Sequence, residues 1–273
     1  MVKKITLLFS NLFERPFSKE KILAGRYQVI SHLGMGSYGR SYLVLDLVTQ
    51  TKKVLKALRL HKRITKAGRQ GFELEKILLN SIDNPGFPMY FEDGTYKKIP
   101  YYTMEFIDGK NFEQLIFAEK MVIPEREAFR IAFELLEHIE YLHCRNLIHR
   151  DIRIPNVILD GSKIRLIDLG LARPLTFKYK EKRRKLDLRK EVNQQADFYG
   201  LGHFLLFLLY SNFTYQENTP EKSWEEELDI SDQAKRIIRR LLQIDIAYDN
   251  CAQIKADIQQ FILNQGREKN VVL

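Results

Sequence analysis

One stretch of the chain carries acidic and amide side chains at a spacing suited to phosphoryl transfer. Asp151 is an acid that can accept a hydroxyl proton, and the amide Asn156 follows five residues later. A second carboxylate, Asp168, stands twelve residues beyond Asn156. Amide and carboxylate oxygens are hard ligands of the kind that Mg²⁺ prefers. The spacing therefore predicts a metal site made by Asn156 and Asp168, next to Asp151 as the base.

A glycine-rich segment lies upstream of this stretch. Gly34, Gly36 and Gly39 have the spacing G-x-G-x-x-G, which opens dinucleotide-binding folds when a helix follows. Here residues 40–46 continue as a strand, so we expect the tip of a hairpin, whose backbone N–H groups can lie close over phosphates. Lys56 follows in the next strand pattern, where it can reach the phosphates of a nucleotide. On its own, a glycine segment with this spacing is most often an ordinary hairpin.

The order of glycine loop, lysine, acid, amide and metal acid resembles the signature of the protein kinase family, in the eukaryotic-type serine/threonine branch that includes bacterial members. The resemblance implies ATP as cofactor with Mg²⁺, or Mn²⁺ as the alternative ion. It implies that Lys56 binds phosphate oxygens and is held by Glu75, and that Asp151 orients the acceptor hydroxyl and takes its proton. Arg153 stands where most serine/threonine kinases have lysine, so the positive charge is kept with a different geometry. A serine or threonine acceptor is expected.

The resemblance also predicts how the adenine of ATP is held. Val54 and Ile158 match the family's apolar contacts on the two sides of the base. The backbone from Glu105 to Ile107 resembles the strand that reads the edge of the base. Ser41 departs from the family, which usually has valine at this position, so one apolar contact is weakened.

The elements that must position these residues fall into two regions. Residues 27–106 contain short alternating segments typical of strands, with one helix from about 69 to 80. Later residues have helical periodicity, clearest from Phe129 to Leu142, and further helices are predicted at 196–210, 231–244 and 252–263. The expected fold is the α+β, two-lobed protein kinase fold. Its expected parts are an N-terminal extension at 1–25 and a kinase domain at 26–268, made of a small antiparallel-sheet N-lobe at 26–106 and a larger helical C-lobe at 107–268.

One segment departs from the family pattern. Residues 178–190 are strongly basic and replace the peptide-binding strand and the Ala-Pro-Glu sequence of the family. The arginine that pairs with that glutamate is also missing, since residues 248–250 read Tyr-Asp-Asn. Losing both partners is coherent, because one buried charge without the other would cost roughly 3–5 kcal/mol. The remodelled platform keeps two alternatives open, a kinase of a sugar or lipid head group and a nucleotide-binding pseudokinase scaffold.

Net charge and cysteine content bear on the partners and the location of the protein. The chain has 44 Lys and Arg against 35 Asp and Glu, a formal charge of +9. We expect an acidic protein substrate, and a solvated basic surface is favoured over nucleic-acid binding. Cys144 and Cys251 form neither a disulfide framework nor a paired metal spacing, which indicates a reducing, cytoplasmic location. No apolar run is long enough to span a membrane. Residues 3–13 have the spacing of a short amphipathic helix, for which packing on the protein is favoured over contact with a membrane surface.

Overall fold

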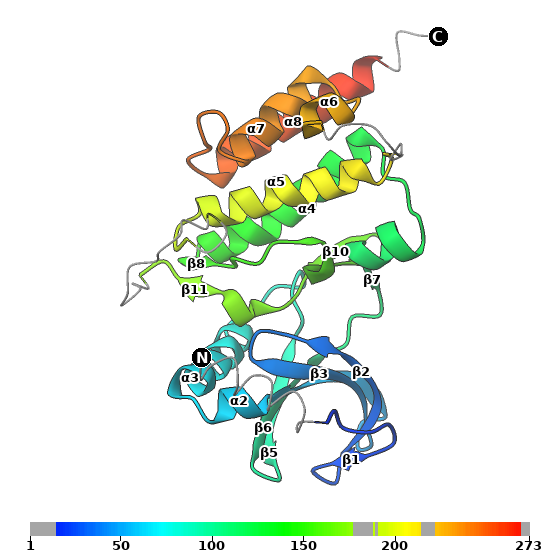
Figure 1. Cartoon of the computed structure of the whole chain (residues 1–273), viewed down its shortest axis with the longest axis vertical. Helices are drawn as coiled ribbons and strands as arrows, with labels where there is room; N and C mark the ends of the chain where they lie inside the picture. Colours follow the sequence, from blue (N-terminus) through cyan, green and yellow to red (C-terminus); the bar gives the residue numbers. More distant parts are fainter. Residues whose placement is uncertain (1–14, 177–187, 189–190, 214–221, 269–273) are drawn as a thin grey trace. The chain divides into compact units, whose positions relative to one another are not determined.

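The structure is a computed structural model that describes residues 15–176, 188, 191–213 and 222–268. The chain divides into two compact units, which Figure 1 shows as a sheet-containing unit and a helical unit. The first comprises the residues up to Asp108 together with Asp168–Leu171, and the second comprises Gly109–Ile167 and the residues from Ala172 onward. The short segment 168–171 therefore belongs to the sheet-containing unit, although the chain on both sides of it belongs to the helical unit.

The sheet-containing unit is built on six antiparallel strands in the order β1-β2-β3-β4-β6-β5. The alternating segments that predict strands at 27–30, 41–45, 54–58 and 101–104 are present as β2, β3, β4 and β6, whereas β1 and β5 are additional. β1 lies inside the segment 1–25 that the sequence assigns to an extension. Its two residues pair with the start of β2, so this part of the segment belongs to the sheet. The strands are β1 (Ile22–Leu23), β2 (Tyr27–Met35), β3 (Gly39–Asp46), β4 (Thr51–Leu58), β5 (Tyr90–Tyr96) and β6 (Ile99–Glu105).

Two helices accompany this sheet, α2 (Leu60–Arg63) and α3 (Lys66–Asn80). α3 begins before the predicted residue 69 because the side chain of Thr65 caps it, accepting a hydrogen bond from the Gly68 N–H at 3.1 Å. Ile77, one of the apolar residues of the expected helix, is 55% exposed. Leu78 is buried instead, because it continues the helical face that contains Phe72.

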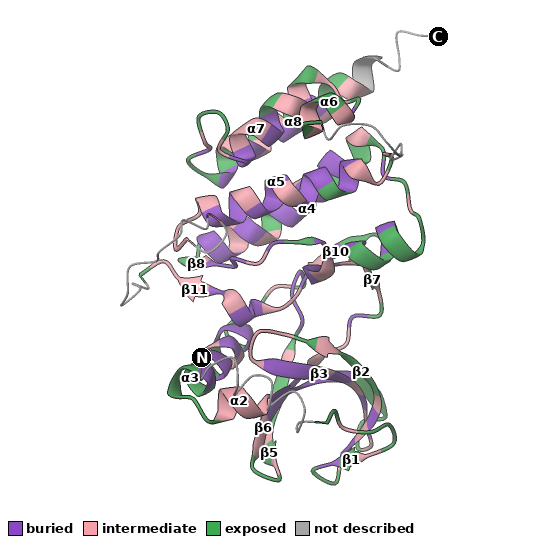
Figure 2. Ribbon diagram, viewed as in Figure 1, coloured by how far each residue is buried: buried purple, intermediate pink, exposed green. Residues whose placement is uncertain are grey.

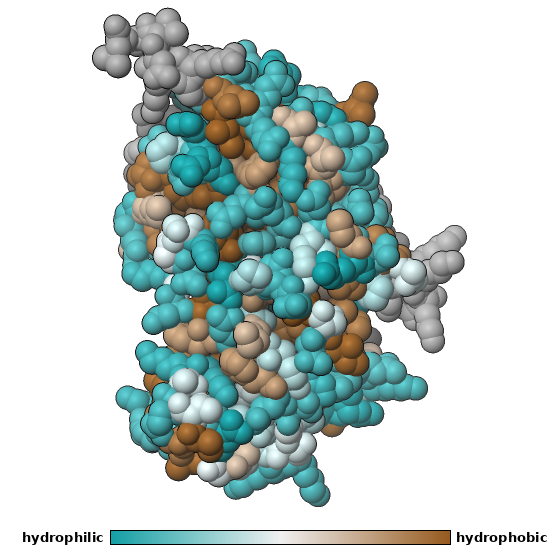
Figure 3. Space-filling model, turned by 180° about the vertical axis from the view of Figure 1, so that it is seen from behind, coloured by the Kyte–Doolittle hydropathy of each residue, from teal (hydrophilic) through white to brown (hydrophobic). Residues whose placement is uncertain are grey.

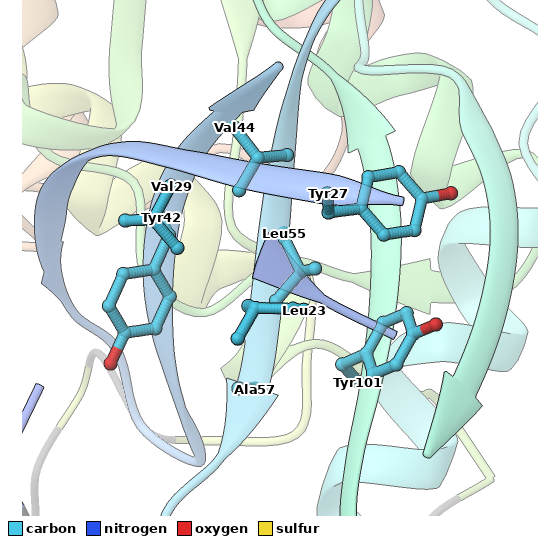
Figure 4. Close-up of a cluster of buried hydrophobic side chains, with 8 residues drawn as sticks. All are labelled: Leu23, Tyr27, Val29, Tyr42, Val44, Leu55, Ala57 and Tyr101. Carbon is cyan, nitrogen blue, oxygen red and sulfur yellow. The ribbon is translucent and has the colours of Figure 1, made fainter. Parts of the chain in front are cut away.

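One cluster of buried side chains fills the inside of this sheet (Figure 4). Its members come from five strands, so each strand contributes alternate residues to the same face. The cluster consists of Leu23, Tyr27, Val29, Tyr42, Val44, Leu55, Ala57 and Tyr101.

A buried carboxylate ties neighbouring strands together at one end of the same unit. Asp46 is fully buried and accepts hydrogen bonds from the Nε and Nη2 atoms of Arg26, each at 2.7 Å. The Nζ atom of Lys53 donates to the same carboxylate at 2.7 Å. These hydrogen bonds, those from Arg26 above all, hold the pKa of Asp46 well below its usual range. Asp46 is therefore ionised throughout the neutral range.

The helical unit is organised around two helices, α4 (Glu125–His143) and α5 (Gln195–Tyr210), whose surfaces are largely buried (Figure 2). The predicted helices of this region are present. One ends earlier than expected, at Leu241, and α6 is additional. The other elements are β7 (Lys110–Asn111), the π-helix Gln114–Ala118, β8 (Leu147–Ile148), β9 (Val157–Asp160), β10 (Lys163–Leu166), β11 (Arg173–Pro174), α6 (Trp224–Glu227), α7 (Asp232–Leu241) and α8 (Cys251–Glu268).

The surface drawn in Figure 3 is mostly hydrophilic, with hydrophobic side chains in separate small groups. Among the described residues, no helix combines the length and the apolar character needed to cross a membrane. The predicted amphipathic helix at 3–13 lies outside the described residues, as does the basic run 178–190 except for residue 188.

Candidate active site

Lys56 stands at the centre of a charged cluster in the sheet-containing unit. Its Nζ atom makes ion pairs with the carboxylate of Glu75, on α3, and with Asp168 Oδ1 at 3.0 Å. The side chains of Lys56 and Glu75 are each only 2% exposed. The contact between Lys56 and Glu75 that the resemblance implied is thus present, and Asp168 joins it although it is distant in sequence.

Burial and charge set the protonation of this cluster. Burial alone would lower the pKa of Lys56, but Asp168 and Glu75 together raise that pKa well above its usual value. Lys56 is therefore a fixed positive charge. Burial raises the pKa of the Glu75 carboxyl to about 7 against the opposing influence of Lys56. The hydroxyl of Tyr102 donates a hydrogen bond to Glu75 Oε1 at 2.9 Å, which satisfies part of this buried group.

The glycine loop is the tip of a hairpin, as the sequence predicted. β2 and β3 are antiparallel neighbours, and the Gly36 N–H donates to the Gly39 carbonyl at 2.9 Å across the turn. A Cβ atom at Gly36 would lie 3.1 Å from Asp168 Oδ2 and 3.2 Å from Lys56 Nζ. A Cβ atom at Gly39 would lie 2.7 Å from Lys56 Cγ. Gly34 pairs with Ser41 at the start of the turn. Glycine at positions 36 and 39 therefore lets the backbone lie directly against the charged cluster.

Asp168 is held in an unusual backbone conformation. Its φ is +64°, in the left-handed region, which costs about 1–3 kcal/mol when a residue other than glycine is forced into it. The Gly170 N–H, in the short 3₁₀ helix Leu169–Leu171, donates to Asp168 Oδ1 at 3.0 Å. The conformation is thus fixed by a local hydrogen bond, and it directs the carboxylate toward Lys56.

The predicted adenine contacts of this unit lie on neighbouring strands. Val54, on β4, is 8% exposed and is the cross-strand partner of Met104, on β6. Glu105 is engaged with Met89, because the two residues exchange backbone and side-chain hydrogen bonds of 2.8 and 3.1 Å. Ile107 is 5% exposed, and its backbone N–H makes no hydrogen bond to any described residue. The Ile107 N–H therefore takes no part in the backbone hydrogen bonds of the described residues.

A second set of predicted residues lies in the helical unit. The Asn156 Nδ2 atom donates to the backbone carbonyl and to Oδ2 of Asp151, both at 2.9 Å. Arg153 Nε lies 3.0 Å from Asp151 Oδ1, with the arginine side chain 53% exposed. Asn156 ends the short 3₁₀ helix Ile154–Asn156, and Ile158 follows in β9. Because the Asn156 amide nitrogen faces Asp151, its oxygen, which has no hydrogen-bond partner among the described residues, is left to act as a ligand.

A buried carboxylate fixes the loop that carries Asp151. Asp197, on α5, is fully buried and accepts the backbone N–H groups of His149 at 2.9 Å and Arg150 at 2.6 Å. The Nε2 atom of His143 lies 2.9 Å from the same carboxylate. Burial would raise the pKa of Asp197, but His143 and the backbone N–H groups lower it below its usual value. These bonds hold Arg150 at a φ of +66° and so set the direction in which Asp151 leaves the loop.

Sequence reasoning missed two residues of these arrangements. Tyr102 is the cross-strand partner of Lys56, so strand alternation placed it on the same face as the lysine. That signal was available from the alternating pattern of β6. His143 closes α4 and had no comparable signal, since its contact with Asp197 spans 54 positions of sequence.

The predicted site residues therefore form two sets that belong to different units. The helical unit contains Asp151, Arg153, Asn156 and Ile158. The sheet-containing unit contains Gly34, Gly36, Gly39, Val54, Lys56, Glu75, Glu105, Ile107 and Asp168.

Comparisons with known proteins identify the family of the chain. Residues 27–265 match the protein kinase domain family. The chain is 38% identical over 258 residues to the probable serine/threonine-protein kinase YbdM of Bacillus subtilis, a match that covers 94% of this chain and 98% of the relative. It is 27% identical over 157 residues to the serine/threonine-protein kinase PrkC of the same organism, covering 57% of this chain and 24% of the relative.

Solved structures show the same fold. The kinase domain of Mycobacterium tuberculosis PknI aligns with a TM-score of 0.67 at 20% identity, and the alignment covers 90% of this chain and 99% of that domain. The predicted α+β kinase fold, with an antiparallel-sheet lobe and a helical lobe, is thereby confirmed. Because the family match extends over most of the chain, and the relative from B. subtilis is similar along nearly its whole length, the chain belongs to the protein kinase family.

Proposed function

We propose that this chain transfers the terminal phosphoryl group of ATP to serine or threonine hydroxyls of a protein. The observation that carries the proposal is the cluster in which the buried Lys56 contacts both Glu75 and Asp168. A buried cation fixed by two carboxylates is suited to phosphate oxygens, because phosphoryl transfer depends mainly on positioning and charge neutralisation. The intact cluster favours catalysis over a scaffold that only binds nucleotide.

The donor set fits a divalent metal ion, which we propose to be Mg²⁺. Asp168 offers a carboxylate, and Asn156 offers an amide oxygen that accepts no hydrogen bond from a described residue. Hard oxygen donors of these two kinds suit Mg²⁺, with Mn²⁺ as the alternative ion. When bound, such an ion neutralises charge on the phosphates of ATP. The hairpin tip at Gly36 and Gly39 presents backbone rather than side chains to the same phosphates.

Asp151 has the role of base in this proposal. Asn156 and Arg153 each contact one oxygen of its carboxylate, which holds the group in one orientation. Asp151 then accepts the proton of the acceptor hydroxyl as that oxygen attacks the phosphorus atom. Arg153 is half exposed and so can neutralise negative charge near the acceptor.

The substrate class follows from the relatives and from charge. YbdM and PrkC are both named serine/threonine-protein kinases, which supports the same acceptor type here. The net charge of +9 and the basic run in the sequence at 178–190 favour a protein substrate with acidic residues around the acceptor. The unpaired Cys144 and Cys251 fit a reducing, cytoplasmic compartment.

Labelled ATP tests the proposal directly. The purified chain is incubated with Mg²⁺, labelled ATP and peptides whose hydroxyl is serine, threonine or tyrosine, each in an acidic and a basic version. We expect label on the serine and threonine peptides, faster in the acidic version, and none after Mg²⁺ is chelated. Asp168→Asn is the control for contaminating kinases. ATP binding without transfer to any peptide would contradict the proposal, as would transfer confined to sugar or lipid head groups.

A further inference from the structure

A pocket of about 220 Å³ lies in the sheet-containing unit, on the face of the sheet that points away from Lys56. Ser41 and Lys56 are cross-strand partners and share one face, so their neighbours Arg40 and Ala57 lie on the other. Arg40 and Ala57 line the pocket. It is therefore a separate site from the charged cluster around Lys56.

The pocket contains arginines without counterions. Arg40 is only 6% exposed, and its Nε atom is buried without a hydrogen-bond partner. The Nε atom of Arg63, at the end of α2, is in the same state, and Arg15 adds a third guanidinium to the lining. Among the described residues, no carboxylate lines the pocket, and neither Arg40 nor Arg63 makes an ion pair or a ring contact with any of them. Burying a charge without a partner is unfavourable, so the buried Arg40 favours an anion in this pocket.

The titration of neighbouring groups agrees with an excess of positive charge. Burial, and after it the charge of Arg40, lowers the pKa of His32. Burial, then Arg59 and Lys62, lowers the pKa of His61 on α2 to about 4. His32 therefore resists protonation, first because it is partly buried and then because Arg40 is close. A bound anion would reverse this effect and raise the pKa of His32.

The rest of the lining is apolar. Phe17, Tyr42 and Ile99 line the pocket together with Ala57. Tyr42 and Ala57 belong to the buried cluster of the sheet drawn in Figure 4, so this side of the pocket is continuous with the core. A ligand that fits both sides must combine an anionic head with an apolar body.

We propose that this pocket binds a phosphoryl group attached to an apolar carrier, that is, a phosphate monoester. Guanidinium groups offer forked N–H donors that match the oxygens of phosphate, and the two charges of a monoester suit more than one arginine. The apolar lining accommodates the carrier. The site lies apart from the nucleotide cluster and goes beyond the transfer reaction proposed above.

Calorimetric titration of the full chain tests the site. Inorganic phosphate and phenyl phosphate are compared, with Mg²⁺ and a non-hydrolysable ATP analogue filling the nucleotide site. We expect one phenyl phosphate per chain, bound about tenfold or more tightly than inorganic phosphate because the phenyl group is buried. Arg40→Met should weaken binding about tenfold or more, since a charged donor is lost. Lys97→Met, which removes a lysine at a turn of the same sheet, is the matched control and should bind as wild type does.

Thermal unfolding and NMR provide readouts independent of affinity. In phosphate-free buffer, Arg40→Met should unfold at a higher temperature than wild type, because an unpaired buried charge is removed. Phenyl phosphate should raise the unfolding temperature of the wild type and not that of the variant. It should also raise the pKa of His32. Arg63→Met should weaken binding in the same direction.

Several outcomes would overturn the proposal. Phenyl phosphate that binds Arg40→Met and wild type equally would refute the role of the arginines. Binding that the ATP analogue abolishes would assign the ligand to the nucleotide site. Equal affinity for inorganic phosphate and phenyl phosphate would refute the apolar half of the site.

Discussion

The two units hold their candidate catalytic groups by different means. In the sheet-containing unit, Lys56 and Glu75 are almost fully buried and neutralise each other directly. In the helical unit, Asp151 and Arg153 are partly exposed. The buried carboxylate of Asp197 fixes their loop by accepting the backbone N–H groups of His149 and Arg150.

Substitutions at the candidate catalytic groups should therefore affect folding and activity together in one unit and activity alone in the other. A buried ion pair cannot lose one member without leaving an unpaired charge inside the unit, so substitutions there affect both folding and activity. An exposed group held through the backbone can be replaced with little effect on folding. The helical unit should therefore tolerate changes at its reacting side chains that the sheet-containing unit does not.

The largest effect on activity is expected at the base. Asp151→Asn keeps the shape of the side chain and removes its ability to take a proton, so the rate of transfer to peptide should fall roughly 10²–10⁴-fold. The far-ultraviolet circular dichroism and the unfolding midpoint should stay close to those of wild type. A variant that keeps the wild-type rate would remove Asp151 from the mechanism.

The buried pair offers the sharpest contrast. Lys56→Met should abolish most transfer and also lower the free energy of unfolding at pH 8 by roughly 3–5 kcal/mol, since the buried carboxyl of Glu75 is left without its partner. The pKa of Glu75 is about 7 in the folded chain, above its usual 4.5, and loses the lowering influence of Lys56 in the variant. The folded state of the variant therefore binds more protons than the unfolded state from about pH 4.5 upward, and its stability falls as pH rises through this window.

Denaturant unfolding at pH 5 and pH 8 checks this prediction. The deficit of Lys56→Met should be smaller at pH 5, where Glu75 is protonated. The control is the double variant Lys56→Met, Glu75→Gln. Its difference in unfolding free energy from wild type should change much less between pH 5 and pH 8 than that of Lys56→Met. An equal deficit for Lys56→Met at both pH values would contradict the assignment of the charge to Glu75.

Asp46 extends the same reasoning to a site without catalytic groups. Asp46→Asn should lower the free energy of unfolding at pH 7 by about 3 kcal/mol, because Arg26 and Lys53 lose their shared carboxylate. The folded pKa of Asp46 is depressed, so its contribution is complete above the unfolded pKa near 4 and is lost as pH falls toward the folded value. Unfolding curves of the variant and wild type should therefore converge below about pH 4. A constant difference down to pH 2 would speak against this ion pair.

The smallest effect is expected at the exposed arginine. Arg153→Ala should reduce transfer about tenfold, roughly the 1.4 kcal/mol of one charged contact, and change the free energy of unfolding by less than about 0.5 kcal/mol. Arg153→Lys should recover part of the rate, because it restores the charge without the planar geometry. Steady-state rates with one acidic peptide measure both variants. A loss of stability in Arg153→Ala would show that the arginine supports the loop as well.

Much of the fold followed from the sequence, because strand alternation is a local signal, and the contact of Lys56 with Glu75 was implied by the resemblance to the kinase family. β5 was not predicted, since alternate residues of that strand are exposed and it contains Gly94. Ile77 is exposed although it is apolar, because it does not lie on the side of the helix that contains Phe72, Glu75 and Leu79.

The remaining features of the site depend on tertiary contacts that no local pattern encodes. Hydrogen bonds impose the left-handed conformations of Arg150 and Asp168. The Arg150 N–H donates to Asp197, and the Gly170 N–H donates to the side chain of Asp168. The orphaned Arg40 was equally invisible, because alternation shows that its side chain leaves one face of the strand but not that it lacks a counterion there.

The most direct test asks whether ATP binding and phosphoryl transfer depend on different residues. The affinity for ATP and the transfer rate are measured across a range of Mg²⁺ concentrations for wild type, Asp168→Asn and Asp151→Asn. We predict that Asp168→Asn loses the increase of ATP affinity with Mg²⁺ together with transfer. Asp151→Asn should keep the wild-type dependence of affinity on Mg²⁺ and lose only the rate. An unchanged response to Mg²⁺ in Asp168→Asn, or weakened ATP binding in Asp151→Asn, would contradict this division between the two units.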